Sequence, residues 1–415
     1  MQTQGIFETY QVKLKTHSFL SIQNQGKDRG PIVYHGGRGY YIDEDALLDF
    51  LYSEKEELVD PYLEWIKKGC ENAKFIRKYE SILLPFIYRF KKDIYVGERG
   101  GRFVRTHCGK TGVYVPGSSL KGAIRTAIMY SVIESNPQLK QRTKEVLTTK
   151  IEDYDRERDD KKRETFAKEL MEIIFQGYCL KLHADHKVSV PSPFTDFLRA
   201  VKVFDGQVHD PRLASPKLCL LHLQEGGASG YRARIKRFET QVECLRQKSE
   251  VIFKMTIDRR LLQEFQTRTT LGDLNLDLSF EGIWRMVDAF AKQQWAYEEQ
   301  IFNQITTYDP SEGLDAVIHF YRMSPGDRAL IRLGYGSGLF GTTVDLLLKG
   351  ERIDRGKLRR KPLLKVLRDV VLLTKHGEQR PLPVPKTRRL VVFQNPESLS
   401  PLGWCTIVDW VQVSR

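Results

Sequence analysis

Alternating apolar and polar residues mark several strands along the chain. Near the start, Tyr10, Val12 and Leu14 alternate with polar neighbours, which predicts a strand over 10–16 with one buried face. Further short apolar segments predict strands at 251–257, 329–333, 390–393 and 404–411. Strands are therefore expected near both ends of the chain as well as in its middle.

Helical periodicity separates these strands. An acidic turn at Asp43 precedes apolar residues at helical spacing up to Leu51, a pattern typical of a helix start. Other helices are predicted at 61–79, 120–133 and 282–306. Residues 137–176 are dense in opposite charges three or four positions apart, which predicts a solvated helical insertion at about 137–200. Because strands and helices recur in both halves, we expect an α+β protein of two modules, 1–245 and 246–415.

Composition narrows the class of protein. A length of 415 residues suggests about two or three domains. The formal net charge of +13 favours a polyanionic partner, nucleic acid first and an acidic membrane surface second. The start of the chain does not resemble a secretion signal, and its apolar runs are too short to span a membrane. The six cysteines form no CxxC pair, so we expect a cytoplasmic protein without a disulfide framework.

The segment PGSSLKGAIR at 116–125 is the strongest local signal. Pro116 and Gly117 predict a turn, and a serine is expected to cap the helix that follows. Lys121 and Arg125 lie one helical turn apart. Exposed amides, hydroxyls and cations together make a phosphate site, contributed here by Ser118, Ser119, Lys121 and Arg125. An ordinary capped helix with a solvated basic face is the alternative interpretation.

A glycine-rich segment follows the predicted strand at 329–333. Its spacing Gly336-x-Gly338-x-x-Gly341 matches a dinucleotide fingerprint, but no second buried strand follows at the distance that a Rossmann unit needs. Close approach of an RNA backbone to the loop amides fits the charge better. The window 321–390 holds 17 Lys and Arg against 6 Asp and Glu. The expected RNA contacts here are Arg332, Gly334, Tyr335, Gly336, Ser337, Gly338, Lys386, Arg388 and Arg389.

Two weaker patterns carry little chemistry. His107-Cys-Gly-Lys-Thr111 lacks the first glycine of a phosphate-binding P-loop, because Val104 stands there. Cys179, His183 and His186 have a ligand-like spacing without a second matching pair, so we expect neither a metal nor another cofactor.

The motif at 115–125 closely resembles the P-G-S-S-x-K-G-x-x-R signature of the RAMP superfamily of CRISPR-associated RNA-binding proteins. The glycine-rich segment resembles that superfamily's late glycine-rich loop. The endings Pro385-Lys-Thr-Arg-Arg389 and Pro401-Leu-Gly-Trp404 are similar to the family of fifth Csm subunits of type III-A effector complexes. The chain departs from this family at Ile22-Gln-Asn-Gln-Gly26, where glycines are usual, and at Ser337, where Lys often stands.

The resemblance implies two ferredoxin-like (RRM-type) modules and a place at the head end of a ribonucleoprotein. There the subunit would contact the 3′ portion of the CRISPR RNA. It would support RNA maturation and assembly in antiviral defence, beside backbone and small Csm subunits and with host nucleases as further partners. No membrane partner is expected.

Catalysis is the less favoured function. Metal-independent RNA cleavage needs a positioned acid and base. His17 and His35 are candidates, and Asp28 lies where the backbone subunit of such complexes carries its cleaving Asp. None has a second acid or base residue at a recognisable sequence spacing, so we expect a non-catalytic RNA-binding subunit. The alternatives are a metal-independent CRISPR-RNA-processing endoribonuclease and, more remotely, a nucleotide-dependent oxidoreductase.

Overall fold

The computed structural model describes most of the chain outside a few segments. The described residues are 6–22, 33–35, 38–70, 72–95, 103–104, 108–109, 112–143, 145, 172–176, 178–183, 186–188, 192–209, 211–226, 230–267, 276–323, 326, 328–342, 345–348, 387–395 and 397–414. They form a mixed α+β fold, as the sequence predicts, with two large and mainly antiparallel sheets. The finer division into two ferredoxin-like modules stays a prediction.

The first large sheet joins the two ends of the chain. In it, β1 (Phe7–Thr16) lies between β16 (Glu250–Asp258) and β22 (Trp404–Ser414) and runs antiparallel to both. On β1, Tyr10, Val12 and Leu14 are buried, as their alternation predicts. The remaining strands are β19 (Leu330–Arg332) beside β22, and β10 (Val201–Val203), β11 (Gly206–Val208), β7 (Gly112–Val115) and β6 (Cys108–Gly109) on the β16 side.

The second large sheet has the order β18-β14-β13-β20-β21 among the described strands. These are β18 (Ile305–Thr307), β14 (Gly230–Val242), β13 (Lys217–Gly226), β20 (Thr387–Val392) and β21 (Leu399–Ser400), with β5 (Phe103–Val104) beside β14. Each large sheet takes strands from both sides of residue 245. The boundary between 1–245 and 246–415 therefore does not separate two sheets, and which residues form folding units stays a prediction.

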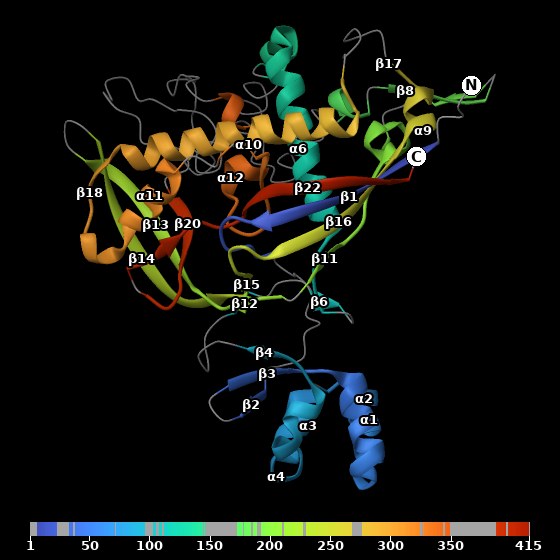
Figure 1. Ribbon diagram of the computed structural model, residues 1–415, viewed down its shortest axis with the longest axis vertical. Helices are drawn as coiled ribbons and strands as arrows, with labels where there is room; N and C mark the ends of the chain where they lie inside the picture. Colours follow the sequence, from blue (N-terminus) through green and yellow to red (C-terminus); the bar gives the residue numbers. More distant parts are fainter. Residues whose placement is uncertain are drawn as a thin grey trace, which may run out of the picture.

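One long helix crosses both sheets. In Figure 1, α10 (Phe280–Asn303) runs above them, and α6 (Gly117–Ser135) crosses it. At its start the ring of Phe280 stacks on Tyr10 of β1, with 4.1 Å between centroids, and near its end Phe302 stacks on Tyr321 of α11. These contacts place α10 in the largest core cluster of the molecule. Shorter helices are α9 (Arg259–Glu264), α11 (Leu314–Arg322) and α12 (Gly338–Thr342).

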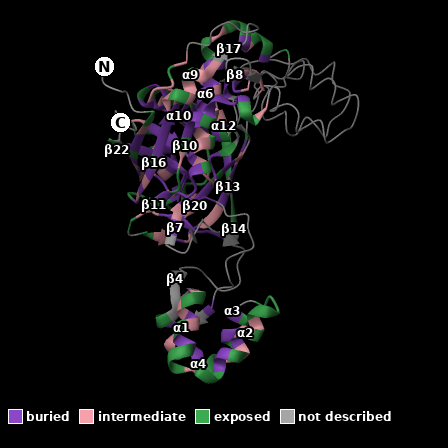
Figure 2. Ribbon diagram, turned by 90° about the vertical axis from the view of Figure 1, so that its right-hand side faces the viewer, coloured by how far each residue is buried: buried purple, intermediate pink, exposed green. Residues whose placement is uncertain are grey.

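Residues 33–95 form a smaller unit with its own core, which lies apart from the large sheets in Figures 1 and 2. It contains α1 (Glu44–Glu54), α2 (Val59–Lys67), α3 (Asn72–Lys78), α4 (Glu80–Leu83), α5 (Ile87–Phe90), β2 (Val33–His35), β3 (Arg38–Ile42) and β4 (Lys91–Tyr95). Asp43 caps α1, as predicted, by accepting from the N–H of Ala46. The expected helix at 61–79 is divided instead, because Gly69 takes a left-handed φ of 66°.

The predicted helical insertion is wrong for its later part. This part contains β8 (Tyr178–His183) and β9 (His186–Val188), and β8 pairs with both β9 and β17 (Phe265–Thr267). The run Tyr-Cys-Leu-Lys-Leu-His alternates with period two, which suits a strand. Residues 146–171 lie outside the described part of the chain. The remaining short elements are β12 (Leu213–Ala214), β15 (Cys244–Leu245) and the 3₁₀ turns 56–58, 84–86, 193–195, 197–200, 310–312 and 345–348.

No described helix is both long enough and apolar enough to cross a membrane.

Candidate nucleic-acid interface

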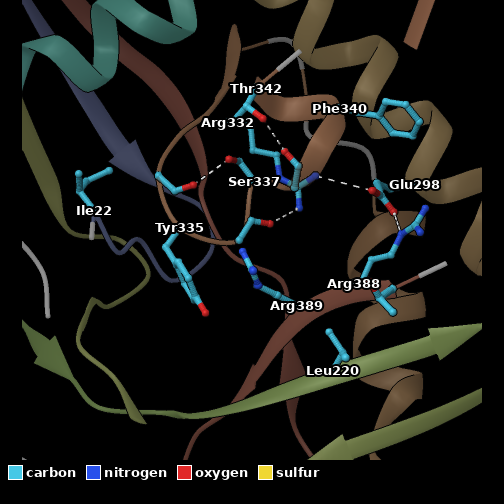
Figure 3. Close-up of a pocket in the computed structure, with 14 residues that line it drawn as sticks. Ile22, Leu220, Glu298, Arg332, Tyr335, Ser337, Phe340, Thr342, Arg388 and Arg389 are labelled. Carbon is cyan, nitrogen blue, oxygen red and sulfur yellow. Dashed lines mark hydrogen bonds and ion pairs between the residues drawn. The ribbon is translucent and has the colours of Figure 1, made fainter. Parts of the chain in front are cut away.

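A cavity of about 770 Å³ lies between the start of β20 and the loop that follows β19 (Figure 3). Eight of the thirteen residues predicted to contact RNA line it. They come from two segments that stand some fifty residues apart in the sequence and meet here: Arg332, Gly334, Tyr335, Gly336, Ser337 and Gly338 on one side, Arg388 and Arg389 on the other. The fold therefore joins two of the three predicted motif regions into one site.

The glycine loop, residues 333–338, has a conformation that its glycines make possible. Gly334, Gly336 and Gly338 have φ angles of 74°, 88° and 71°, in the left-handed region that other residues rarely adopt. At Gly334 a Cβ would lie 2.3 Å from the carbonyl oxygen of Ser21. The next amide, of Tyr335, donates to that same oxygen at 2.7 Å. The loop is thus held against the residues that follow β1.

Two arginines of the cavity share one buried carboxylate. Arg388 Nε on β20 donates to Glu298 Oε2 of α10 at 2.8 Å, and Arg332 Nη1 on β19 lies 3.7 Å from Glu298 Oε1 (Figure 3). All three side chains are at least nine-tenths buried. Glu298 therefore links both large sheets to α10. Since two guanidinium groups face one carboxylate, the cluster keeps an excess positive charge.

Arg332 also holds the loop. Its Nη2 donates to the carbonyl oxygen of Gly336 at 3.2 Å, and its guanidinium lies 4.8 Å from the ring centroid of Trp404. The Ser337 hydroxyl donates to the Gly334 carbonyl oxygen at 2.7 Å within the loop. Arg332 and Ser337 thus make contacts within the protein. They affect a bound ligand indirectly, because they fix the conformation of the loop and Arg332 adds positive charge near it.

Arg389 and Tyr335 form one accessible part of the cavity wall. Arg389 is exposed, and its guanidinium lies 4.9 Å from the ring centroid of half-buried Tyr335. A cation above an aromatic ring offers a charge for phosphate and a flat surface for a base. Lys386, the third predicted cation of this segment, lies outside the described residues.

The helix α6 begins differently from the expectation. Pro116 is its N-cap residue, and no serine side chain caps it. Instead the N–H of Gly117 donates to Asp205 Oδ1 at 2.8 Å. A Cβ on Gly117 would lie 2.4 Å from the carbonyl oxygen of Val203, so only glycine fits this close approach. The predicted serine cap is wrong, because a neighbouring loop supplies a carboxylate to the helix terminus.

The two cations of this helix differ in their surroundings. Arg125 Nη2 lies 2.6 Å from Asp196 Oδ2, and its guanidinium lies 4.5 Å from the ring centroid of Phe175. Arg125 is therefore a partner in a packed ion pair, rather than a side chain on a freely exposed face. Burial and the nearby Arg125 charge lower the pKa of Lys121. Ser118 is exposed and Ser119 half-buried, and none of the four residues lines the cavity.

The histidines proposed for RNA cleavage are far from an acid–base arrangement with each other. His17 packs beside the rings of Trp295 and Phe320, at 5.9 and 5.2 Å between centroids, and burial lowers its pKa. His35 belongs to β2 of the separate small unit. Asp28 lies outside the described residues. Among the described residues, no three His, Cys, Asp or Glu side chains are grouped so that they could hold a metal ion.

The glycine spacing does not belong to a dinucleotide-binding unit. β19 pairs antiparallel with β22, and the helix after the loop, α12, has only five residues. A Rossmann fingerprint needs a parallel strand–helix–strand unit at this point. The interpretation as a nicotinamide site therefore loses its structural basis.

Two features of this region were not predicted from the sequence. One is Glu298, because a single acid inside a long helix has no sequence signal that marks a buried ion pair. The other is a row of exposed cations on β14, Arg232, Arg234 and Lys236, which alternate with buried Ala233 and Ile235. Their period-two spacing in the sequence could have predicted a strand with one basic face.

Comparison with known proteins identifies the fold. No protein-family model matches the chain, and no curated protein matches it. Among solved structures, a chain of a Csm–crRNA–target RNA ternary complex of a type III-A CRISPR-Cas system is similar, with a TM-score of 0.56 and 21% identity over 96% of this chain and 100% of that one. Csm5 of T. onnurineus is similar over 95% of this chain and 100% of that one, with a TM-score of 0.51 and 20% identity.

These likenesses define the class of fold: the described chain has the architecture of a Csm-complex subunit along nearly its whole length. Of these two similar structures, the second is that of Csm5 of T. onnurineus. The resemblance inferred from the Pro-Gly-Ser-Ser and glycine-loop motifs is thereby confirmed at the level of the fold.

Proposed function

We propose that this protein is an RNA-binding subunit of a type III-A CRISPR effector complex. In this proposal it contacts the 3′ portion of the CRISPR RNA, caps the head end of the complex and supports RNA maturation and assembly in antiviral defence. Its partners are the CRISPR RNA and the backbone and small Csm subunits, with host nucleases recruited to the complex. It works in the cytoplasm and is not itself catalytic.

The cavity between the glycine loop and β20 carries the proposal. Three arginines and one glutamate line it, and the other lining residues are uncharged. Arg389 and Tyr335 present a cation and an aromatic face at its accessible side, while buried Arg332 and Arg388 add positive field behind them. Such a combination suits single-stranded RNA, in which phosphates and unstacked bases are both accessible.

The structural likeness supports the same proposal independently. One similar chain comes from a complex that contains CRISPR RNA and target RNA, and this chain covers all of that one. Position at the head end and contact with the 3′ portion extend beyond the shared fold, and they follow from the motif resemblance.

Co-purification tests the proposal directly. The tagged chain is expressed together with the products of its neighbouring genes, and retained RNA is sequenced. We expect a stable complex whose RNA carries repeat-derived sequence at one end, and loss of that RNA with Tyr335→Ala combined with Arg389→Gln. Recovery of the chain alone, or of RNA without repeat sequence, would overturn it. Incubation of the purified chain with repeat RNA and a chelator tests the alternative function, a CRISPR-RNA-processing endoribonuclease. A metal-independent endoribonuclease would still cleave the RNA under these conditions.

A further inference from the structure

One face of the second large sheet carries cations on two strands, β20 and β14, with a histidine on β13 between them. In the register of the sheet, Arg389 of β20 stands opposite Leu220 of β13, which stands opposite Lys236 of β14. The next row contains Thr387, His222 and Arg234, and the row beyond it pairs Gln224 with Arg232. Residues opposite each other on neighbouring strands share a face, so these side chains project to the same side.

That side is the outer one. The alternate residues Leu221, Leu223, Ala233 and Ile235 are buried in the core cluster that also contains α10. Arg232, Arg234, Lys236 and Arg389 are exposed, and His222 is half-buried. We call these five residues the basic face: His222, Arg232, Arg234, Lys236 and Arg389.

The charge of the basic face is not neutralised within its rows. No acidic residue occupies any of the three rows. Among the described residues, Arg232, Arg234 and Lys236 make no ion pair, and Lys236 lies 5.4 Å from the ring centroid of Phe238. Glu312 borders the strand, where it accepts from the N–H of Ile235 at 3.3 Å. Cations left unpaired on an exposed surface fit a polyanion.

The basic face is continuous with the cavity. Leu220, Thr387 and Arg389 belong to its rows and also line the cavity. Lys236 stands two strand spacings from Arg389, roughly 10 Å away, and alternate residues on β14 are about 7 Å apart. A chain of phosphates leaving the cavity past Arg389 would therefore cross β13 beside His222 and then meet the cations of β14.

From this geometry we infer that the basic face is a second RNA-binding surface, which holds the backbone of single-stranded RNA beyond the cavity. The inference extends the proposed function and rests on it for the identity of the RNA. It assigns phosphate contacts to Arg232, Arg234 and Lys236. Phosphate contacts carry no base information, so this surface binds RNA without sequence preference.

A triple variant of the full chain, Arg232→Gln with Arg234→Gln and Lys236→Gln, tests the surface. Binding of a fluorescent oligouridylate is measured over a range of salt concentrations. We expect affinity to fall several-fold at low salt, and the slope of log affinity against log salt to shrink by about 2, since each lost single-strand contact removes about 0.7. The melting temperature should stay unchanged, because these side chains are exposed.

Two matched variants keep the test specific. Lys67→Gln with Lys68→Gln and Arg77→Gln removes the same formal charge from exposed positions of the small unit, and should leave the slope unchanged. Arg232→Lys with Arg234→Lys and Lys236→Arg preserves charge and should preserve binding. An unchanged slope in the triple variant, or an equal loss in the small-unit control, would overturn the inference.

Two further outcomes separate this inference from the proposed function and from another partner. If Tyr335→Ala alone leaves binding intact while the triple variant weakens it, the basic face stands and the cavity fails. If the reverse holds, the basic face fails and the cavity stands. Unlabelled polyglutamate and unlabelled oligouridylate are also compared as competitors of the fluorescent RNA. If polyglutamate competes equally well, the partner of the basic face is an acidic protein segment and not RNA, and the inference is overturned.

Discussion

The guanidinium of Arg389 lies over the ring of Tyr335, and this contact connects β20 with the glycine loop across the mouth of the cavity. Neither residue is near the other in sequence, and both were expected to contact RNA for separate reasons. Their meeting gives the site a charge and a stacking surface in one place. Substituting one residue at a time can therefore separate the effect of the charge from the effect of the aromatic ring.

Tyr335→Ala should weaken binding of single-stranded RNA by about 1 to 3 kcal/mol if one base stacks on the ring, whereas Tyr335→Phe should keep most of the affinity. The ring is half-buried, so the melting temperature of each variant is measured alongside. Equal losses in both variants would show that the hydroxyl, and not stacking, carries the effect.

Glu298→Gln should destabilise the fold strongly. It leaves the buried Arg332 and Arg388 guanidinium groups without a counter-charge, a change that costs about 3 to 5 kcal/mol in buried pairs. The free energy of unfolding in urea measures the loss. Glu299→Gln, at the next and less buried position of α10, is the control and should change stability by less than about 0.5 kcal/mol. A stable Glu298→Gln variant would show that the arginines do not need this carboxylate.

Lys121→Ala and Arg125→Ala should separate RNA binding from stability on α6. Arg125 pairs with Asp196 at 2.6 Å, so Arg125→Ala should lower the melting temperature. Lys121 forms no ion pair among the described residues, and Lys121→Ala should reduce the salt slope of RNA binding by about 0.7 with little loss of stability. Unaltered RNA affinity in the Lys121 variant would remove this helix from the RNA site.

The sequence predicts several strands of the large sheets and the long helix α10 because their periodicity is local, but β13 and β14 of the second sheet were not predicted. β1, β16, β22 and α10 all lie within a few residues of their expected positions. It does not predict sheet partners: that β1 pairs with β22, and β13 with β20, depends on contacts between residues far apart in the chain.

In the candidate site, too, local features were predicted from the sequence and long-range contacts were not. Glycines and arginines were found from motifs, because their chemistry is visible in the residue types. The burial of Arg332 and Arg388 around Glu298 was not, because it depends on which helix covers the strand ends. Asp205 at the start of α6 was missed for the same reason: a loop almost ninety residues away supplies it.

Two glycines of α6 should respond oppositely to alanine. Gly117→Ala should destabilise the fold, since the new Cβ would lie 2.4 Å from the Val203 carbonyl oxygen and 2.7 Å from backbone atoms of Phe204. Gly122→Ala meets nothing within 4 Å and lies in an exposed helical position, so it should stabilise by up to about 1 kcal/mol. Thermal unfolding of both variants checks the pair. A neutral Gly117→Ala would mean that the loop at 203–205 moves away without cost.

Stability should fall in mild acid because of His17. Burial lowers the pKa of its imidazole below the ordinary value of 6.5, so the unfolded chain takes up the proton first. Unfolding is then favoured as pH falls through 6.5, and the loss ends once pH drops below the folded-state pKa. His17→Gln should remove this part of the pH dependence, while His209→Gln at an exposed position should retain it. Melting temperatures measured from neutral to mildly acidic pH decide the matter, and identical profiles for wild type and His17→Gln would rule out His17 as the titrating group.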